Sequence, residues 1–96
     1  MNALLATLLV TVAAGGGPRQ AEGELLSNGQ IRVRHRGSLV AKSYDGRIKL
    51  RLRPGEYQVE ALLAAEEGKP ARLCQTSTVR LKRGRTTRLK LGCSIK

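Results

Sequence analysis

The chain has 96 residues, 18 Lys and Arg against seven Asp and Glu, and a formal net charge of +11. Such a length suits one small domain, which buries only about 60% of its unfolded surface and often depends on a cross-link. With two Tyr, no Trp and no Phe, the chain lacks the aromatic platforms on which single-stranded nucleic acids stack. Nucleic acid is therefore an unfavoured partner.

The first 17 residues carry no charged side chain, and an apolar run over 3–14 is followed by three glycines. The run is too short to cross about 30 Å of hydrocarbon as a helix, and Ala13 and Ala14 suit a signal peptidase site. This layout predicts a signal peptide over 1–17, a short polar lead over 18–28 and one domain over 29–96, and so a secreted or envelope-associated protein. An uncleaved anchor and a misplaced start codon are the alternatives, because no Lys or Arg precedes the run.

Alternating apolar and polar residues predict strands over 30–36, 38–44, 47–53, from residue 56, within 71–82 and from residue 87. The dipeptide Asp45-Gly46 is typical of a type I′ hairpin turn, and Pro54-Gly55 of a type II turn with Gly55 left-handed. Together these signals predict a β-meander over 44–61. Residues 62–70 read as a long loop, with a helical turn as the alternative.

About six to seven short strands without an amphipathic helix predict an all-β fold, a small antiparallel β-sandwich or barrel. In it, Tyr57 is expected in the core, its hydroxyl hydrogen-bonded at a strand corner. Cys74 and Val79 differ in strand parity, which predicts a β-bulge between them.

The Asp45-Gly46 turn, the segment Pro54-Gly55-Glu56-Tyr57 and the run Gly84-Arg85-Thr86-Thr87 occur in an order that resembles the carboxypeptidase regulatory-like domains. That resemblance implies a transthyretin-like β-sandwich. The chain departs from the family where Ile48 stands in place of an aromatic residue, and in its missing or shortened opening strand. The resemblance implies no hydrolase activity, because the carboxypeptidase catalytic domain has no counterpart here.

Cys74 and Cys93 are the only two cysteines. In an exported chain an even count favours a disulfide, worth on the order of 3 kcal/mol in the chain-entropy model. Zinc is unfavoured, since two thiols and the single imidazole of His35 fall short of four ligands. No metal and no cofactor are expected.

Catalysis would require His35 to meet Ser38 or Ser43 and Asp45 in space. Ser and Asp beside hairpins are ordinary turn residues. We therefore expect no enzyme and no catalytic residues.

Basic residues recur at every second position of the predicted strands. The candidate anion-binding residues are Arg32, Arg34, Arg36, Arg47, Lys49, Arg51, Arg53, Arg80, Lys82, Arg88 and Lys90. Rows of like charge cost stability unless an acid or an external anion neutralises them. The pattern favours a module that binds an anionic envelope polymer or lipid surface. The alternative is a structural or protein-interaction module that uses sheet-edge pairing, in which the charges only solubilise the domain.

Overall fold

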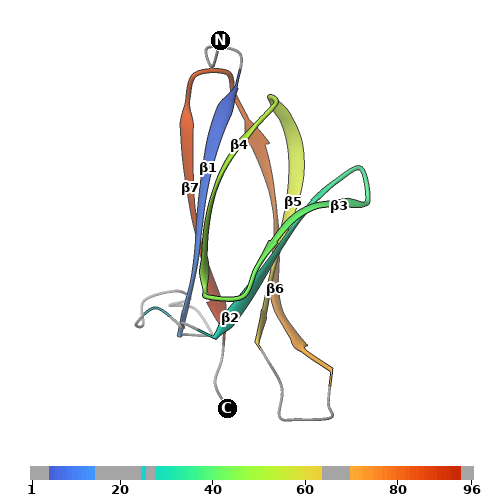
Figure 1. Cartoon of the computed structure of the whole chain (residues 1–96), viewed down its shortest axis with the longest axis vertical. Helices are drawn as coiled ribbons and strands as arrows, with labels where there is room; N and C mark the ends of the chain where they lie inside the picture. Colours follow the sequence, from blue (N-terminus) through green and yellow to red (C-terminus); the bar gives the residue numbers. More distant parts are fainter. Residues whose placement is uncertain (1–4, 15–24, 26–27, 64–69, 94–96) are drawn as a thin grey trace.

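The protein is an all-β sandwich whose strands form two sheets that pack face to face (Figure 1). The computed structural model describes residues 5–14, 25, 28–63 and 70–93. The strands are β1 (Ala6–Ala14), β2 (Gly29–His35), β3 (Ser38–Ser43), β4 (Arg47–Leu52), β5 (Gly55–Leu63), β6 (Arg72–Leu81) and β7 (Thr86–Cys93). Across the described residues, no helix is long and apolar enough to span a membrane. The architecture confirms the predicted small β-sandwich.

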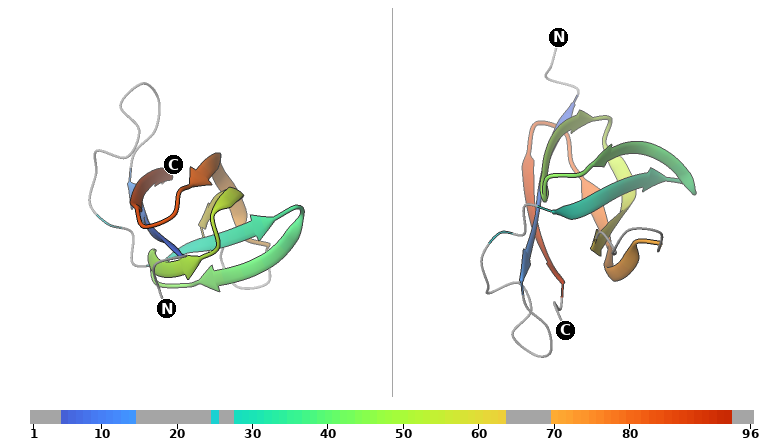
Figure 2. Two further views of the ribbon diagram at one scale, coloured as in Figure 1. Left: turned by 90° about the horizontal axis from the view of Figure 1, so that it is seen from above. Right: turned by 60° about the horizontal axis from the view of Figure 1, so that its bottom comes forward.

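The smaller sheet has the strand order β4-β1-β7 and the larger sheet the order β3-β2-β5-β6. β1 is antiparallel to β4 but parallel to β7, whereas every pair in the larger sheet is antiparallel. The end of the β2–β3 hairpin extends beyond the rest of the sandwich (Figure 2). The expected antiparallel arrangement thus holds for each pair except β1 and β7.

The central strand of the smaller sheet lies within the segment that the sequence indicates as a signal peptide. Leu8, Val10 and Val12 of β1 are at most 1% exposed, because they alternate toward the opposite sheet. The sandwich therefore begins at residue 6, ahead of the boundary expected at residue 29. Because β1 lies between β4 and β7, a chain from which residues 1–17 have been removed cannot form this smaller sheet. The signal peptide itself stays a prediction.

The predicted β-meander is wrong. β4 pairs with β1, whereas β3 and β5, which precede and follow it in the chain, belong to the other sheet. Ile48 lies opposite Val10 and Leu50 opposite Leu8, so the apolar face of β4 covers the core from the side of the smaller sheet. The dipeptides Asp45-Gly46 and Pro54-Gly55 therefore connect one sheet to the other.

The turn conformations differ from the predicted ones for the same reason. A type I′ turn requires positive φ at both central residues. Gly46 has a φ of 80°, but Asp45 is not among the non-glycine residues of positive φ. Gly55 has a φ of 151°, far from the roughly +80° of a type II turn. The two consecutive positive values, 52° and 83°, belong to Arg36 and Gly37 in the β2–β3 hairpin.

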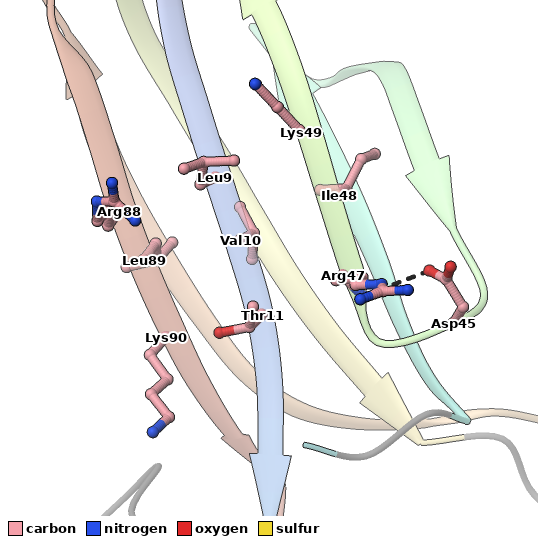
Figure 3. A pocket seen from close by; sticks show the side chains of 10 residues that line it. All are labelled: Leu9, Val10, Thr11, Asp45, Arg47, Ile48, Lys49, Arg88, Leu89 and Lys90. Atoms are coloured by element: carbon pink, nitrogen blue, oxygen red, sulfur yellow. Dashed lines mark hydrogen bonds between the residues drawn. The ribbon is translucent and has the colours of Figure 1, made fainter. Parts of the chain in front are cut away.

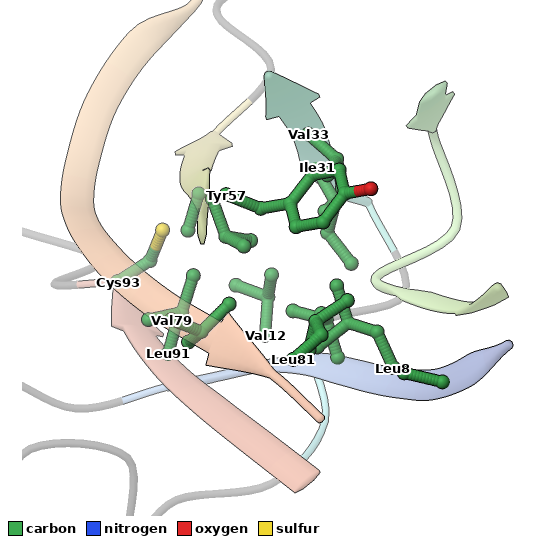
Figure 4. Packing of buried hydrophobic residues seen from close by; sticks show 13 residues of the cluster. Leu8, Val12, Ile31, Val33, Tyr57, Val79, Leu81, Leu91 and Cys93 are labelled. Atoms are coloured by element: carbon green, nitrogen blue, oxygen red, sulfur yellow. The ribbon is translucent and has the colours of Figure 1, made fainter. Parts of the chain in front are cut away.

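The core fills the space between the sheets with aliphatic side chains from β1, β2, β5, β6 and β7 (Figure 4). Its aromatic member, Tyr57, is 5% exposed. The Tyr57 hydroxyl donates a 2.7 Å hydrogen bond to the carbonyl oxygen of Arg53 at the end of β4. This contact confirms the expected position of Tyr57 in the core and of its hydroxyl at a strand corner.

A disulfide joins Cys74 of β6 to Cys93 of β7, as predicted. The pairing of β5 with β6 shifts register at Cys74, because Ala61 lies opposite Gln75 while Leu62 lies opposite Leu73. The extra residue in β6 is Cys74 itself, at one end of the interval in which a bulge was expected. The bulge turns Cys74 toward β7 and so reconciles its parity with that of Val79.

Candidate functional site

The candidate anion-binding side chains divide among three places. Five of them, Arg47, Lys49, Arg51, Arg88 and Lys90, lie on the outer face of the smaller sheet. Arg32, Arg34 and Arg80 lie on the outer face of the larger sheet, and Arg36, Arg53 and Lys82 lie between strands. Their positions follow from the alternation of each strand, whose other face is turned to the core. The structure therefore does not bring all of them to one surface.

On the larger sheet, two acids pair with basic residues and offset part of the positive charge. The Arg34 guanidinium donates to a Glu60 carboxylate oxygen at 3.0 Å, and both side chains are partly buried. Arg80 lies opposite Glu56, with 3.9 Å between nitrogen and oxygen, although both side chains are largely exposed. An exposed pair of this kind contributes about 0–1 kcal/mol. This face has mixed charge.

The smaller sheet differs, because none of its strands contains Asp or Glu. The strand register aligns its outward residues in rows that run across the sheet. These rows are Arg51–Thr7–Thr86, Lys49–Leu9–Arg88 and Arg47–Thr11–Lys90. With neighbouring strands about 4.8 Å apart, the basic residues of β4 and β7 form two lines roughly 10 Å apart, on either side of β1. We refer to this surface, Thr7, Leu9, Thr11, Arg47, Lys49, Arg51, Thr86, Arg88 and Lys90, as the cationic face.

A shallow hollow of about 610 Å³ lies over part of the cationic face. It covers the two rows that contain Leu9 and Thr11. In Figure 3, Leu9 and Thr11 of β1 lie between the residues of β4 and those of β7. The hollow thus combines basic groups at its sides with a largely apolar centre.

Asp45 is the only acid among the residues that line this hollow. Its Oδ1 accepts hydrogen bonds from the Ser43 hydroxyl at 2.7 Å and from the backbone N–H of Arg47 at 3.4 Å. The Ser43 hydrogen bond, followed by that of the Arg47 backbone, lowers the pKa of Asp45 below its usual value of 3.8. These contacts hold the Asp45 carboxylate at the β3–β4 connection.

A second hollow, of about 840 Å³, lies at the end of the sandwich beside the β4–β5 connection. Arg36, Arg51 and Arg53 line it, together with His35 and Glu56. The backbone oxygen of Glu56 can only accept, so His35 donates through Nδ1 across 3.1 Å. The His35 ring packs against Tyr57, with 4.8 Å between ring centroids. This hollow collects basic residues from both sheets, but it also contains an acid.

The residues weighed for catalysis do not come together. Ser43 contacts Asp45, but His35 pairs with Ser38 at the opposite end of β3. Ser43 lies five positions after Ser38 along β3, a distance of roughly 17 Å. Among the described residues, no group of three or more His, Cys, Asp or Glu is placed to hold a metal ion.

Sequence reasoning missed the residues that β1 contributes to the cationic face. Thr7, Leu9 and Thr11 lie in the predicted signal peptide, so their alternation with Leu8, Val10 and Val12 was not read as a strand. That alternation of hydroxyl and buried aliphatic residues was the available signal, and only Leu9 interrupts it. Lys42, which lies opposite Arg32 on the larger sheet, was also missed.

No protein-family model matches this chain, and no curated protein matches its sequence.

Proposed function

We propose that this protein is a non-catalytic module of the cell envelope or the secreted space that binds anionic polymers or surfaces through its cationic face. The observation that carries the proposal is the contrast between the two sheets. Glu56 and Glu60 accompany the basic residues of the larger sheet, whereas the strands of the smaller sheet supply five basic residues and no acid. Such a face concentrates positive potential on one side of the molecule.

The proposed extracytoplasmic location draws support from the Cys74–Cys93 disulfide, since disulfides persist mainly in oxidising compartments. The leader-like run offers a second argument, but the same residues form β1. The proposed binding face includes three residues of that strand. The proposal therefore refers to the chain that retains residues 6–14.

The test compares two triple variants with equal loss of charge. Lys49→Gln, Arg88→Gln and Lys90→Gln alter the cationic face, while the control Arg32→Gln, Lys42→Gln and Arg80→Gln alters the larger sheet. We expect the first variant to bind long-chain polyphosphate at least about tenfold more weakly at low salt, with a shallower dependence of log Kd on log salt concentration. The control should lose less than about threefold.

Fluorescence titration at three salt concentrations gives both quantities, and thermal melts verify that each variant folds. Poly-aspartate serves as a second probe, because binding by charge should depend little on the chemical nature of the polymer. Equal losses in the two variants would mean that only net charge matters, and the assigned face would then be wrong.

A second candidate function is suggested by β3, which has no strand on its far side in the described part of the chain. Leu39 and Val40, consecutive in β3, are each 45% exposed. Val40 has no partner in β2, because the register shifts where Val33 lies opposite Ala41 and Arg34 opposite Leu39. The two exposed apolar side chains of this edge strand suit contact with a strand of another protein. Replacement of Val40 by Lys should abolish such an association and leave polyphosphate binding intact.

A further inference from the structure

The cationic face is apolar at its centre. A site that binds anions by charge alone would gain no affinity from an apolar side chain there. Leu9 lies in one row between Lys49 and Arg88. Its neighbours along the same face of β1 are Thr7 and Thr11, so a Thr at position 9 would make this face of the strand polar throughout. Leu9 is partly exposed, and it lines the hollow.

The flanking side chains extend this apolar surface. Lys and Arg carry long methylene stems that lie along apolar groups while their charged ends remain in water. Lys49 and Arg88 stand on the two sides of Leu9 (Figure 3). A hydrocarbon chain over Leu9 would therefore contact a leucine below and aliphatic stems on both sides.

The next row along the strands has a different character. In it the Thr11 hydroxyl lies between Arg47 and Lys90. Two cations and a hydroxyl donor are suited to an anionic head group, because charge-assisted hydrogen bonds are the strong ones. The two rows lie about 7 Å apart along β1.

From these two rows we infer that the cationic face binds a single-chain amphiphile with an anionic head group. The head group lies at the Arg47–Thr11–Lys90 row, and the alkyl chain lies over Leu9 between the stems of Lys49 and Arg88. This inference rests on the proposed function, which supplies the anion binding. It adds that the preferred ligand carries an alkyl chain as well as charge.

The test uses the full, oxidised chain and a series of alkyl phosphates, from ethyl to octyl phosphate, each below its micellar concentration. We expect Kd, measured by calorimetry, to fall about two- to fourfold for each methylene that reaches Leu9, the lower figure for a partly enclosed chain. Leu9→Thr should flatten this trend, so that octyl phosphate binds this variant about as tightly as ethyl phosphate does. The matched control Leu39→Thr, at an exposed leucine of the other sheet, should leave the trend intact.

Thr11→Val tests the head-group position, since it retains the β-branched shape and removes the hydroxyl. It should weaken the binding of ethyl and octyl phosphate by the same factor. If octyl and ethyl phosphate bind equally well while polyphosphate binding depends on the cationic face, the amphiphile inference is overturned and the proposed function stands. If Leu9→Thr retains the full chain-length trend, the alkyl chain binds elsewhere and the inference is likewise wrong. If no probe binds, both proposals fail.

Discussion

The disulfide between Cys74 and Cys93 connects the two sheets of the sandwich at an edge of each. Cys74 lies in β6, the last strand of the larger sheet, and Cys93 in β7, the last strand of the smaller one. Cys93 is fully buried, while Cys74 is partly exposed at the bulge. The bond therefore closes one side of a small core covalently.

Loss of this bond should destabilise the domain by about 3 kcal/mol, because the unfolded chain regains the freedom of a loop whose ends are 19 residues apart. Denaturant unfolding of the oxidised protein, the reduced protein and the Cys74→Ala, Cys93→Ala variant measures the difference. The reduced protein and the variant should unfold at similar denaturant concentrations. Equal stability of the oxidised and reduced forms would contradict the prediction.

Tyr57→Phe should cost about 1–3 kcal/mol. The substitution leaves the ring in the core but deprives the Arg53 carbonyl of its donor at the strand corner. Tyr44→Phe is the matched control, since Tyr44 is 61% exposed, and it should leave the melting temperature unchanged. If both variants have the melting temperature of the parent, the Tyr57 hydrogen bond contributes nothing to stability.

Gly55→Ala should cost about 1–3 kcal/mol through backbone strain, because few residues other than glycine adopt a φ of 151°. Space is not the cause, as an added Cβ would lie 3.8 Å from the nearest His35 atom. Gly37→Asn is the control, because Asn tolerates the left-handed φ of 83° and nothing lies within 4 Å. Equal melting temperatures for Gly55→Ala and Gly37→Asn would contradict this prediction.

The Asp45 carboxyl should titrate below its usual pKa of 3.8, since the Ser43 hydroxyl and the Arg47 N–H stabilise its ionised form. A lowered folded-state pKa gives a stabilising contribution that is present above the unfolded value and is lost as pH falls through the folded value. The melting temperatures of the parent and Asp45→Asn should accordingly converge as pH falls below about 3.8. Carboxyl-carbon NMR shifts give the pKa directly, and Ser43→Ala should raise it toward 3.8.

Val10→Asn should unfold the domain, whereas Thr11→Asn should be tolerated. Val10 is 1% exposed between the sheets, and a buried amide without partners costs several kcal/mol. Thr11 points to the outer face of the same strand. Circular dichroism and thermal melts of the full chain provide the comparison. Equal melting temperatures would show that residues 6–14 do not belong to the folded domain.

The sequence determined the features that depend on local geometry. Side chains alternate across any strand, so the strands from Ile31 onward and their buried residues were predictable within a residue or two at their ends. The disulfide was predictable because the chain has only two cysteines. The position of Tyr57 was predictable because it follows a Pro-Gly turn by two residues and lies on the apolar face of its strand.

Only the tertiary structure decided which strands share a sheet. Asp45-Gly46 and Pro54-Gly55 reverse the chain equally well within a sheet or between two sheets, and the choice depends on the burial of the β4 apolar face against the core. An apolar run such as residues 3–14 suits both an export leader and a buried strand, and its pairing with β4 and β7 joins residues distant in sequence. The cationic face depends on that pairing, because β1 places the basic residues of β4 and β7 on either side of Leu9 and Thr11. Alternation fixes the direction of each side chain, but only the packing of distant strands fixes its neighbours.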